Sequence, residues 1–245
     1  MESGEREDLL RALGASEGRL TQTETAALDS DGYVVLPDVL SAAQVANARA
    51  ALDKLIAQAR LDPTWHAGGT LHLNDLVNEP AFDPVWKSDR LLAGIVHVIG
   101  YDLRIGSVAY RAPQPGYGAQ ALHADFMQGY RGDYQVATAI VALVDFAEKN
   151  GATRVVPGSH LPGAEIAVPS DADTAHPAQR SVTCSAGSAI VFNGHLLHSG
   201  TRNGSQETRH ALQITFARRT APITGTGRIE NATLERIGNA AFLFL

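Results

Sequence analysis

Two histidines and one aspartate form the most chemically suggestive set of residues in the chain. His123 and Asp125 are separated by a single alanine, and His198 follows far downstream. Residues i and i+2 of a β-strand project to the same face of the sheet, so a strand over residues 121–125 is expected to present both side chains together. Two imidazoles and one carboxylate are the ligand set of non-haem Fe(II) sites, and they leave three metal positions open. The spacing therefore predicts a metal centre built from these side chains.

Three further segments give this set a context. Residues 31–37 read DGYVVLP, residues 150–160 read NGATRVVPGSH, residues 187–201 read GSAIVFNGHLLHSGT, and Arg209 lies eleven positions after His198. Together they resemble the phytanoyl-CoA dioxygenase (PhyH-like) family of Fe(II)/2-oxoglutarate-dependent oxygenases, over residues 30–218. The resemblance implies an enzyme that uses Fe(II), the co-substrate 2-oxoglutarate and O2, and that releases succinate and CO2. Its expected reaction is the oxidation, by default hydroxylation, of a small organic molecule.

The same resemblance implies roles for individual residues. The metal ligands, which are also the catalytic residues, are His123, Asp125 and His198. Arg209 is expected to hold the C5 carboxylate of 2-oxoglutarate, because a planar guanidinium matches a carboxylate with two parallel hydrogen bonds. Gln120 and Thr153 are further candidates for binding 2-oxoglutarate. A carboxylate at position 125 speaks against a halogenase, in which a halide takes that place on the iron.

A strand over residues 209–218 would place Arg209 suitably. Alternation puts Arg209, Ala211 and Gln213 on one face, while Leu212 and Ile214 share the other. The first face is small and polar, as the lumen of a barrel that holds an anion requires. Arg218 and Arg219, at the far end of this segment, are expected to face solvent.

The remaining pattern predicts the elements that position these residues. Helices are expected from Thr23 to Asp31, from Ser41 to about residue 60, where a capping box opens an apolar stripe, and from Ser88 to Gly100. Short strands separated by Gly and Pro turns are expected over residues 33–36, 103–111, 121–125, 135–144, 154–156, 181–183, 188–192 and 209–218. Helices followed by many short strands favour a mainly β fold with flanking helices. The expected architecture is a double-stranded β-helix, a cupin-like jelly-roll barrel, with N-terminal helices against one sheet.

The chain is long enough for one domain, and nothing in it reads as a linker. We expect a single dioxygenase domain over residues 1–245, with a poorly ordered polar lead at 1–20. Residues 161–180 are rich in Pro, Asp, Ala and Ser and are a candidate lid over the barrel mouth.

Composition limits the partners. A net charge of −6 and only three lysines give no electrostatic basis for binding nucleic acid or an anionic membrane, and they disfavour acyl-CoA phosphates. One cysteine, Cys184, excludes an internal disulfide and fits the cytoplasm, as does a charged N-terminus without a signal-like apolar run. The expected partner is a small molecule, such as a specialised metabolite or an amino-acid-like compound, and the expected state is a monomer or homodimer.

Substrate contacts are expected from loops, because jelly-roll oxygenases share a core and differ in their loops. The aromatic candidates are Trp65, Tyr117, Phe126 and Tyr130. Met127 is a further apolar candidate. Two alternatives stay open at this point. One is a cupin-type metalloenzyme that does not use 2-oxoglutarate, and the other is a non-catalytic jelly-roll binding protein.

Overall fold

Two antiparallel sheets form the framework of the protein. The computed structural model describes residues 3–59, 66–67, 69–126, 132–164, 166–169, 171–222 and 229–245. Its strands are β1 (Tyr33–Leu36), β2 (His66–Ala67), β3 (Thr70–Leu73), β4 (Leu103–Pro113), β5 (Val136–Ala142), β6 (Thr153–Val155), β7 (Arg180–Val182), β8 (Ala189–Asn193), β9 (His198–Gly200) and β10 (Ala211–Arg218). The large sheet has the order β1-β8-β5-β10-β4-β3-β2, and the small sheet has the order β7-β6-β9. The expected mainly β, double-sheet jelly roll is confirmed.

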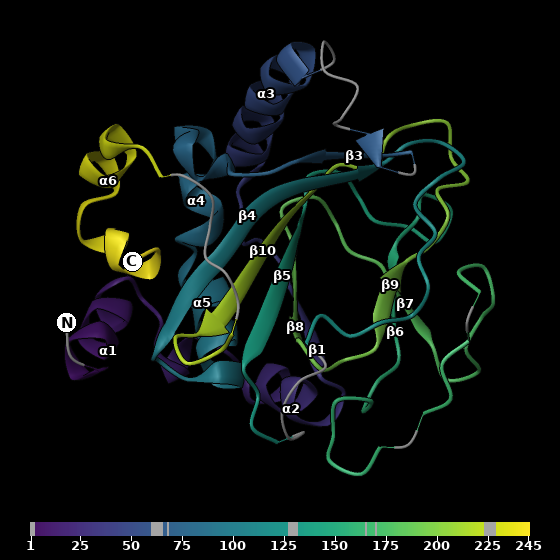
Figure 1. Cartoon of the computed structure of the whole chain (residues 1–245), viewed down its shortest axis with the longest axis horizontal. Coiled ribbons are helices and arrows are strands. Elements are labelled where there is room, and N and C mark those ends of the chain that lie inside the picture. Colours follow the sequence, from purple (N-terminus) through teal and green to yellow (C-terminus); the bar gives the residue numbers. More distant parts are fainter. Residues whose placement is uncertain are drawn as a thin grey trace.

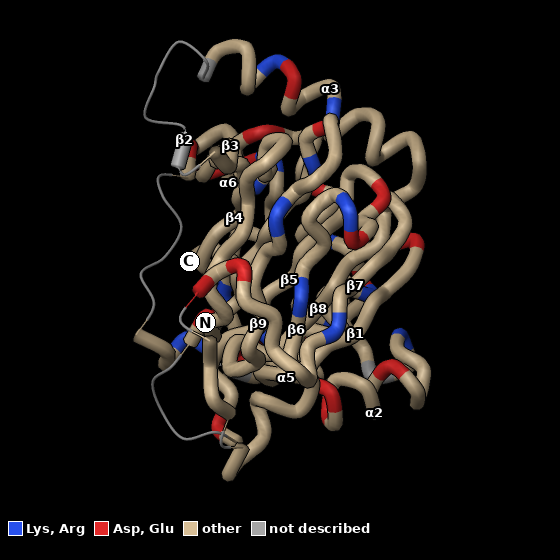
Figure 2. The backbone as a smooth tube through the Cα atoms, turned by 90° about the vertical axis from the view of Figure 1, so that its right-hand side faces the viewer, with Lys and Arg blue, Asp and Glu red and all other residues tan. Residues whose placement is uncertain are grey.

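Helices cover one face of the large sheet, and the small sheet lies on its other side (Figure 1). The helices are α1 (Ser3–Ala12), α2 (Gln22–Ser30), α3 (Ala42–Ala59), α4 (Asp83–Trp86), α5 (Asp89–Ile99) and α6 (Asn231–Ile237), with 3-10 turns at Glu17–Arg19, Leu76–Asn78, Pro80–Phe82 and Gly238–Leu243. None of the helices among the described residues is long and apolar enough to cross a membrane. Acidic and basic residues are interspersed along the tube that faces the viewer in Figure 2.

Helix α5 has the ends and the apolar stripe that the sequence predicts, and the stripe packs on the large sheet. The Ser88 hydroxyl accepts a hydrogen bond from the Leu91 amide at the N-terminus, and Gly100 ends the helix with φ of 78°. The apolar stripe between these ends packs on β5 and β8. Leu92 and Ile95 are fully buried there, so the stripe anchors the helical layer to the centre of the large sheet.

Strand β10 separates the core from the barrel interior as its alternation predicts. Leu212, Ile214 and Phe216 are buried in the main core under the helices. Ala211 and Gln213 line a pocket on the opposite face. The large sheet therefore presents a sealed apolar face to the helices and a polar face to the small sheet.

Three local expectations are corrected by the structure. The polar lead is a packed helix: Leu10 is fully buried, and Arg6 lies 2.7 Å from Asp102 across the fold. The cap of α2 is Thr21 rather than Thr23, because Thr21 and Glu24 form a reciprocal capping box. Arg219 is not directed to solvent; its guanidinium donates to the carbonyl oxygens of residues 242 and 245 in the C-terminal tail.

A fourth correction concerns the segment that carries the first two candidate ligands. Residues 121–125 are not a strand, and only a single bridge joins His123 to His198. The strands β2, β3 and β9 were not expected. They have two to four residues each, too few for alternation to stand out.

Candidate functional site

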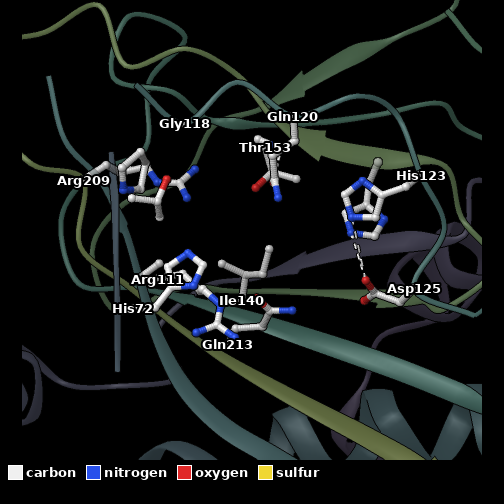
Figure 3. Close-up of a pocket in the computed structure, with 15 residues that line it drawn as sticks. His72, Arg111, Gly118, Gln120, His123, Asp125, Ile140, Thr153, Arg209 and Gln213 are labelled. Atoms are coloured by element: carbon white, nitrogen blue, oxygen red, sulfur yellow. Dashed lines mark hydrogen bonds and ion pairs between the residues drawn. The ribbon is translucent and has the colours of Figure 1, made fainter. Parts of the chain in front are cut away.

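The three candidate ligands meet between the two sheets. Asp125 Oδ1 lies 3.5 Å from His198 Nε2 and 4.0 Å from His123 Nε2. One ligand atom from each side chain lies within 4.8 Å of the other two. Figure 3 shows His123 and Asp125 together at one end of a pocket. A single metal ion fits between three donors at this separation.

Backbone hydrogen bonds bring the two histidines together despite the missing strand. The His123 amide donates to the His198 carbonyl oxygen at 3.0 Å, and the His198 amide donates back at 2.9 Å. The Phe126 amide donates to the Gly194 carbonyl oxygen at 3.0 Å, which fixes the chain just after Asp125. The segment thus holds both candidate ligands against the loop before β9 without belonging to a sheet.

Each imidazole is oriented by the carbonyl oxygen two residues before it. Nδ1 lies 2.9 Å from the Ala121 oxygen in His123 and 3.0 Å from the Leu196 oxygen in His198. A carbonyl oxygen only accepts, so Nδ1 carries the hydrogen and Nε2 keeps its lone pair toward Asp125. Burial lowers the pKa of His198, partly opposed by Asp125, which favours the neutral, metal-binding form of that ring.

The aspartate is held from the large sheet. Thr138 of β5 donates its hydroxyl hydrogen to Asp125 Oδ2 at 2.7 Å. Oδ2 is thereby occupied, and Oδ1 is the oxygen that faces both imidazoles. Thr138 is fully buried. It stands in a strand of mostly small apolar residues, where alternation alone gives no sign of this contact.

Arg209 is a buried cation that has no anion beside it among the described residues. Its side chain packs on the Phe146 ring, with 4.7 Å between Cζ and the ring centroid, and Nη1 donates to the Gly151 carbonyl oxygen. Its Nε has no hydrogen-bond partner among the described residues, and no carboxylate there lies within ion-pair distance. Burial lowers the pKa of Arg209 to about 10, so the residue is still charged near pH 7. A buried charge of this kind needs an anionic partner.

Gln120 and Thr153 line the same pocket. Gln120 Oε1 accepts a hydrogen bond from the Gly200 amide at 3.1 Å, which leaves its amide nitrogen as the group able to donate to a ligand. The backbone oxygen of Gln120 accepts from Arg154. Arg154 was not singled out from the sequence, although it is almost fully buried and also donates to the carbonyl oxygens of Ala172 and Thr174.

The pocket has a volume of about 240 Å³. The described residues that line it are Thr70, His72, Arg111, Pro113, Gly118, Gln120, His123, Asp125, Ile140, Thr153, His198, Gly200, Arg209, Ala211 and Gln213. The sequence therefore located the six candidate site residues but not His72 or Arg111, which reach the pocket only through the pairing of β3 with β4.

The expected aromatic contacts are not found at this pocket. Tyr117 is 53% exposed, and Phe126 is buried against Val136 and Ala217. Trp65, Met127 and Tyr130 lie outside the described residues.

Two further histidines and the cysteine lie apart from the pocket lining. His160 contacts the Asp29 carbonyl oxygen, and His195 stacks on Phe126. Burial raises the pKa of the Cys184 thiol to about 11, which leaves it unreactive near neutral pH.

Comparison with known proteins places this geometry in a family. The family model for phytanoyl-CoA dioxygenase (PhyH) matches residues 28–211. The dioxygenase trt7 of Aspergillus terreus is 30% identical over 214 residues, which cover 77% of this chain and 70% of the relative.

Solved structures agree in fold. SnoN, a non-haem α-ketoglutarate-dependent epimerase from nogalamycin biosynthesis, has 26% identity and a TM-score of 0.66, with 84% of this chain and 86% of SnoN covered. HygX from Streptomyces hygroscopicus, solved with nickel, 2-oxoglutarate and hygromycin B bound, has 20% identity and a TM-score of 0.67, with 86% and 97% covered. The matched span of the family model includes the three candidate ligands and Arg209, and the chain belongs to the phytanoyl-CoA dioxygenase family.

Proposed function

We propose that the protein is a non-haem Fe(II)/2-oxoglutarate-dependent dioxygenase that oxidises a small organic molecule, with release of succinate and CO2. His123, Asp125 and His198 would hold the iron. The observation that carries the proposal is a single pocket with three convergent ligand atoms at one end and an uncompensated buried guanidinium, Arg209, in its wall. A cofactor-free binding protein would have no need of both features.

The chain's own residues suit 2-oxoglutarate as the co-substrate. Its C5 carboxylate would accept hydrogen bonds from the Nε side of Arg209, which has no partner among the described residues. Gln120 and Thr153 would add neutral hydrogen bonds from the pocket wall. The bound iron supplies the redox chemistry with O2, and these residues fix the orientation of the co-substrate and exclude water around it.

Solved relatives support the proposed cofactors, and the reactions they are named for include more than hydroxylation. SnoN was solved with Fe3+, α-ketoglutarate and a nogalamycin compound, and HygX with 2-oxoglutarate and hygromycin B. SnoN is named an epimerase and SnoK a carbocyclase. For this chain we propose hydroxylation, because it asks for no acid or base beyond the residues described. A specialised metabolite or an amino-acid-like compound is the substrate class we propose.

We further propose one catalytic domain over residues 1–245, in which residues 161–180 act as a lid. Part of this segment is fastened beside the pocket: Arg154 holds the carbonyl oxygens of residues 172 and 174. Closure would therefore involve the portion before residue 171, where Ile166 packs on the small cluster of Leu122, Val156 and Leu197, next to the first candidate ligand.

Succinate formation from 2-oxoglutarate under air tests the proposal. With Fe(II) and without added substrate, we expect slow uncoupled turnover that a chelator abolishes and that Zn(II) fails to restore, because zinc has no accessible redox change. Asp125→Ala should bind little iron and form no succinate, whereas Asp145→Ala, outside the pocket lining, should behave as the parent does. Iron binding without any 2-oxoglutarate binding would instead favour a cupin-type metalloenzyme. Full activity of the zinc protein would exclude the dioxygenase.

A further inference from the structure

A second arginine faces the pocket from the strand next to β10. In the large sheet, Arg111 of β4 lies directly opposite His72 of β3 on one side and Ala211 of β10 on the other. Residues opposite one another in an antiparallel sheet project to the same face. Figure 3 shows Arg111, His72 and Gln213 grouped on the wall across the pocket from Gln120 and Thr153.

The hydrogen bonds of Arg111 leave one edge of its guanidinium available. Nη1 donates to Asn74 Oδ1 at 3.1 Å and to the Tyr110 carbonyl oxygen at 3.2 Å. Neither Nε nor Nη2 donates to any described residue, and no described carboxylate forms an ion pair with Arg111. The Nε–Nη2 edge is one of the two that match a carboxylate with paired hydrogen bonds. Asn74 therefore fixes the plane of the guanidinium and leaves this edge free for a ligand.

Among the described residues that line the loaded pocket, no carboxylate is left to balance the charge of Arg111. Asp125 is the one carboxylate among the described lining residues. Iron(II) and the 2-oxoglutarate dianion cancel, and the charges of Asp125 and Arg209 cancel as well. Arg111 is then left as one uncompensated positive charge in a partly buried wall. A charge held away from bulk water is stabilised by an anion beside it.

His72 makes this wall selective rather than simply basic. Burial lowers the pKa of His72, and the neighbouring Arg111 charge lowers it further. The ring is therefore neutral near pH 7, so it can share a hydrogen bond with a ligand without adding a second charge. Thr70 and Gln213 add neutral polar groups to the same wall.

Resting on the proposed function, we propose that the substrate carries a single carboxylate, which binds the Nε–Nη2 edge of Arg111 beside His72. The carboxylate places the substrate against the pocket wall formed by β3 and β4, while 2-oxoglutarate would bind Arg209 and the metal. Arg111 is thus a specificity-determining residue: it recognises a carboxylate-bearing small molecule and discriminates against its neutral amide or ester.

Binding of matched probe pairs tests this assignment without knowledge of the true substrate. The protein is loaded with Mn(II) and saturating 2-oxoglutarate, and calorimetry compares benzoate with benzamide and N-acetylglycine with its amide. We expect each carboxylate to bind at least tenfold more tightly than its amide. Arg111→Gln should remove that preference, and Arg111→Lys should keep part of it, since it retains the charge but not the planar fork. Arg180→Gln, at an exposed arginine outside the pocket lining, should leave it unchanged.

The 2-oxoglutarate affinity of the same variants separates this inference from the proposed function. Arg111→Gln should change the dissociation constant of 2-oxoglutarate by less than threefold. A much larger loss in Arg111→Gln would make Arg111 a co-substrate ligand and overturn the assignment. Carboxylates that bind no better than amides, or a preference that survives in Arg111→Gln, would overturn it too. Failure of the parent protein to bind 2-oxoglutarate at all would instead contradict the proposed function.

Discussion

Thr138 donates its hydroxyl hydrogen to Asp125 Oδ2 at 2.7 Å, and this contact turns Oδ1 toward the two imidazoles. Directly opposite Thr138 in the large sheet is Phe192 of β8, whose ring centroid lies 4.4 Å from that of His198. One cross-strand pair therefore supports two candidate ligands that come from distant parts of the chain. The rigid sheet, rather than the irregular segment 121–125, fixes the geometry of the candidate metal centre.

Loss of the Thr138 hydroxyl should weaken metal binding while leaving the fold intact. Thr138→Val keeps the shape of this buried side chain, but Asp125 loses the donor that orients it. Removing such an outer partner costs about 10- to 100-fold in metal affinity. Titration with Co(II), followed by its absorption, measures the dissociation constant. Thr138→Ser, which keeps the hydroxyl, is the control and should bind within about threefold of the parent. Equal affinity in the valine variant would show that Asp125 needs no such support.

Arg209→Gln should weaken 2-oxoglutarate binding without releasing the metal. A paired, charge-assisted hydrogen bond lost from a desolvated site costs about 2–4 kcal/mol, or roughly 30- to 1000-fold in affinity. Calorimetric titration of the Mn(II)-loaded protein measures the effect, and the Co(II) affinity shows that the metal site is intact. Arg202→Gln is the control, since Arg202 is exposed and paired with Asp173. Unchanged binding in the Arg209 variant would place the co-substrate elsewhere in the pocket.

The convergence of His123, Asp125 and His198 could be predicted from the sequence, because the prediction depends on residue type and on local motifs. The side chains of His123 and Asp125 do point the same way in the structure, but not because they lie on a strand, as predicted. Strand alternation does not apply to residues 121–125, because only one bridge, from His123 to His198, joins this segment to a strand. The side chains converge because reciprocal amide bonds with His198 and the Thr138 hydroxyl place them.

The residues that sequence analysis missed all depend on non-local pairing. Arg111 and His72 become neighbours only when β3 adopts its register with β4, and nothing in either segment encodes that register by itself. Arg154 binds carbonyl oxygens in the segment 171–179, which the sequence marked only as part of a candidate lid. Leu10 is likewise buried among residues from distant parts of the chain, because it belongs to the main hydrophobic core.

The stability of the protein should fall on mild acidification, partly because of His160. Burial lowers the pKa of His160, although the Asp29 carbonyl oxygen partly opposes the shift. Below pH 6.5 the unfolded chain binds a proton at this ring before the folded protein does, so stability declines as the pH falls from that value toward the lower folded pKa. Above pH 6.5 the contribution is constant.

Replacement of His160 isolates this contribution. Urea unfolding at pH 7.5 and pH 5.5 should show a smaller loss in the free energy of unfolding for His160→Gln than for the parent, because the variant no longer has a ring that is protonated more readily in the unfolded chain. His176→Gln, at a partly exposed ring, is the matched control and should follow the parent. Identical pH dependence in all three proteins would show that His160 titrates alike in the folded and unfolded states.

Arg154 should decide how firmly the segment 171–179 is held against the pocket. Its guanidinium donates to the carbonyl oxygens of Ala172, Thr174 and Gln120 at 2.8–3.1 Å, and to Ser199 Oγ at 2.7 Å. In Arg154→Met these acceptors lose a charged donor, which should cost about 2–4 kcal/mol of the free energy of unfolding. Amide hydrogen exchange at Thr174 and Gln179 should accelerate at least tenfold, beyond the change in the core strands. Because Gln120 loses its anchor, 2-oxoglutarate affinity should fall as well.

The control for this prediction is Arg202→Gln. Arg202 also contacts the segment, through Asp173, but both side chains are about half exposed, and exposed ion pairs contribute little. We expect less than about 0.5 kcal/mol of destabilisation and nearly unchanged exchange in that variant. If Arg154→Met left the exchange of residues 171–179 at the parent rate, the segment would be held by its own turns, and closure of the pocket could then not depend on Arg154.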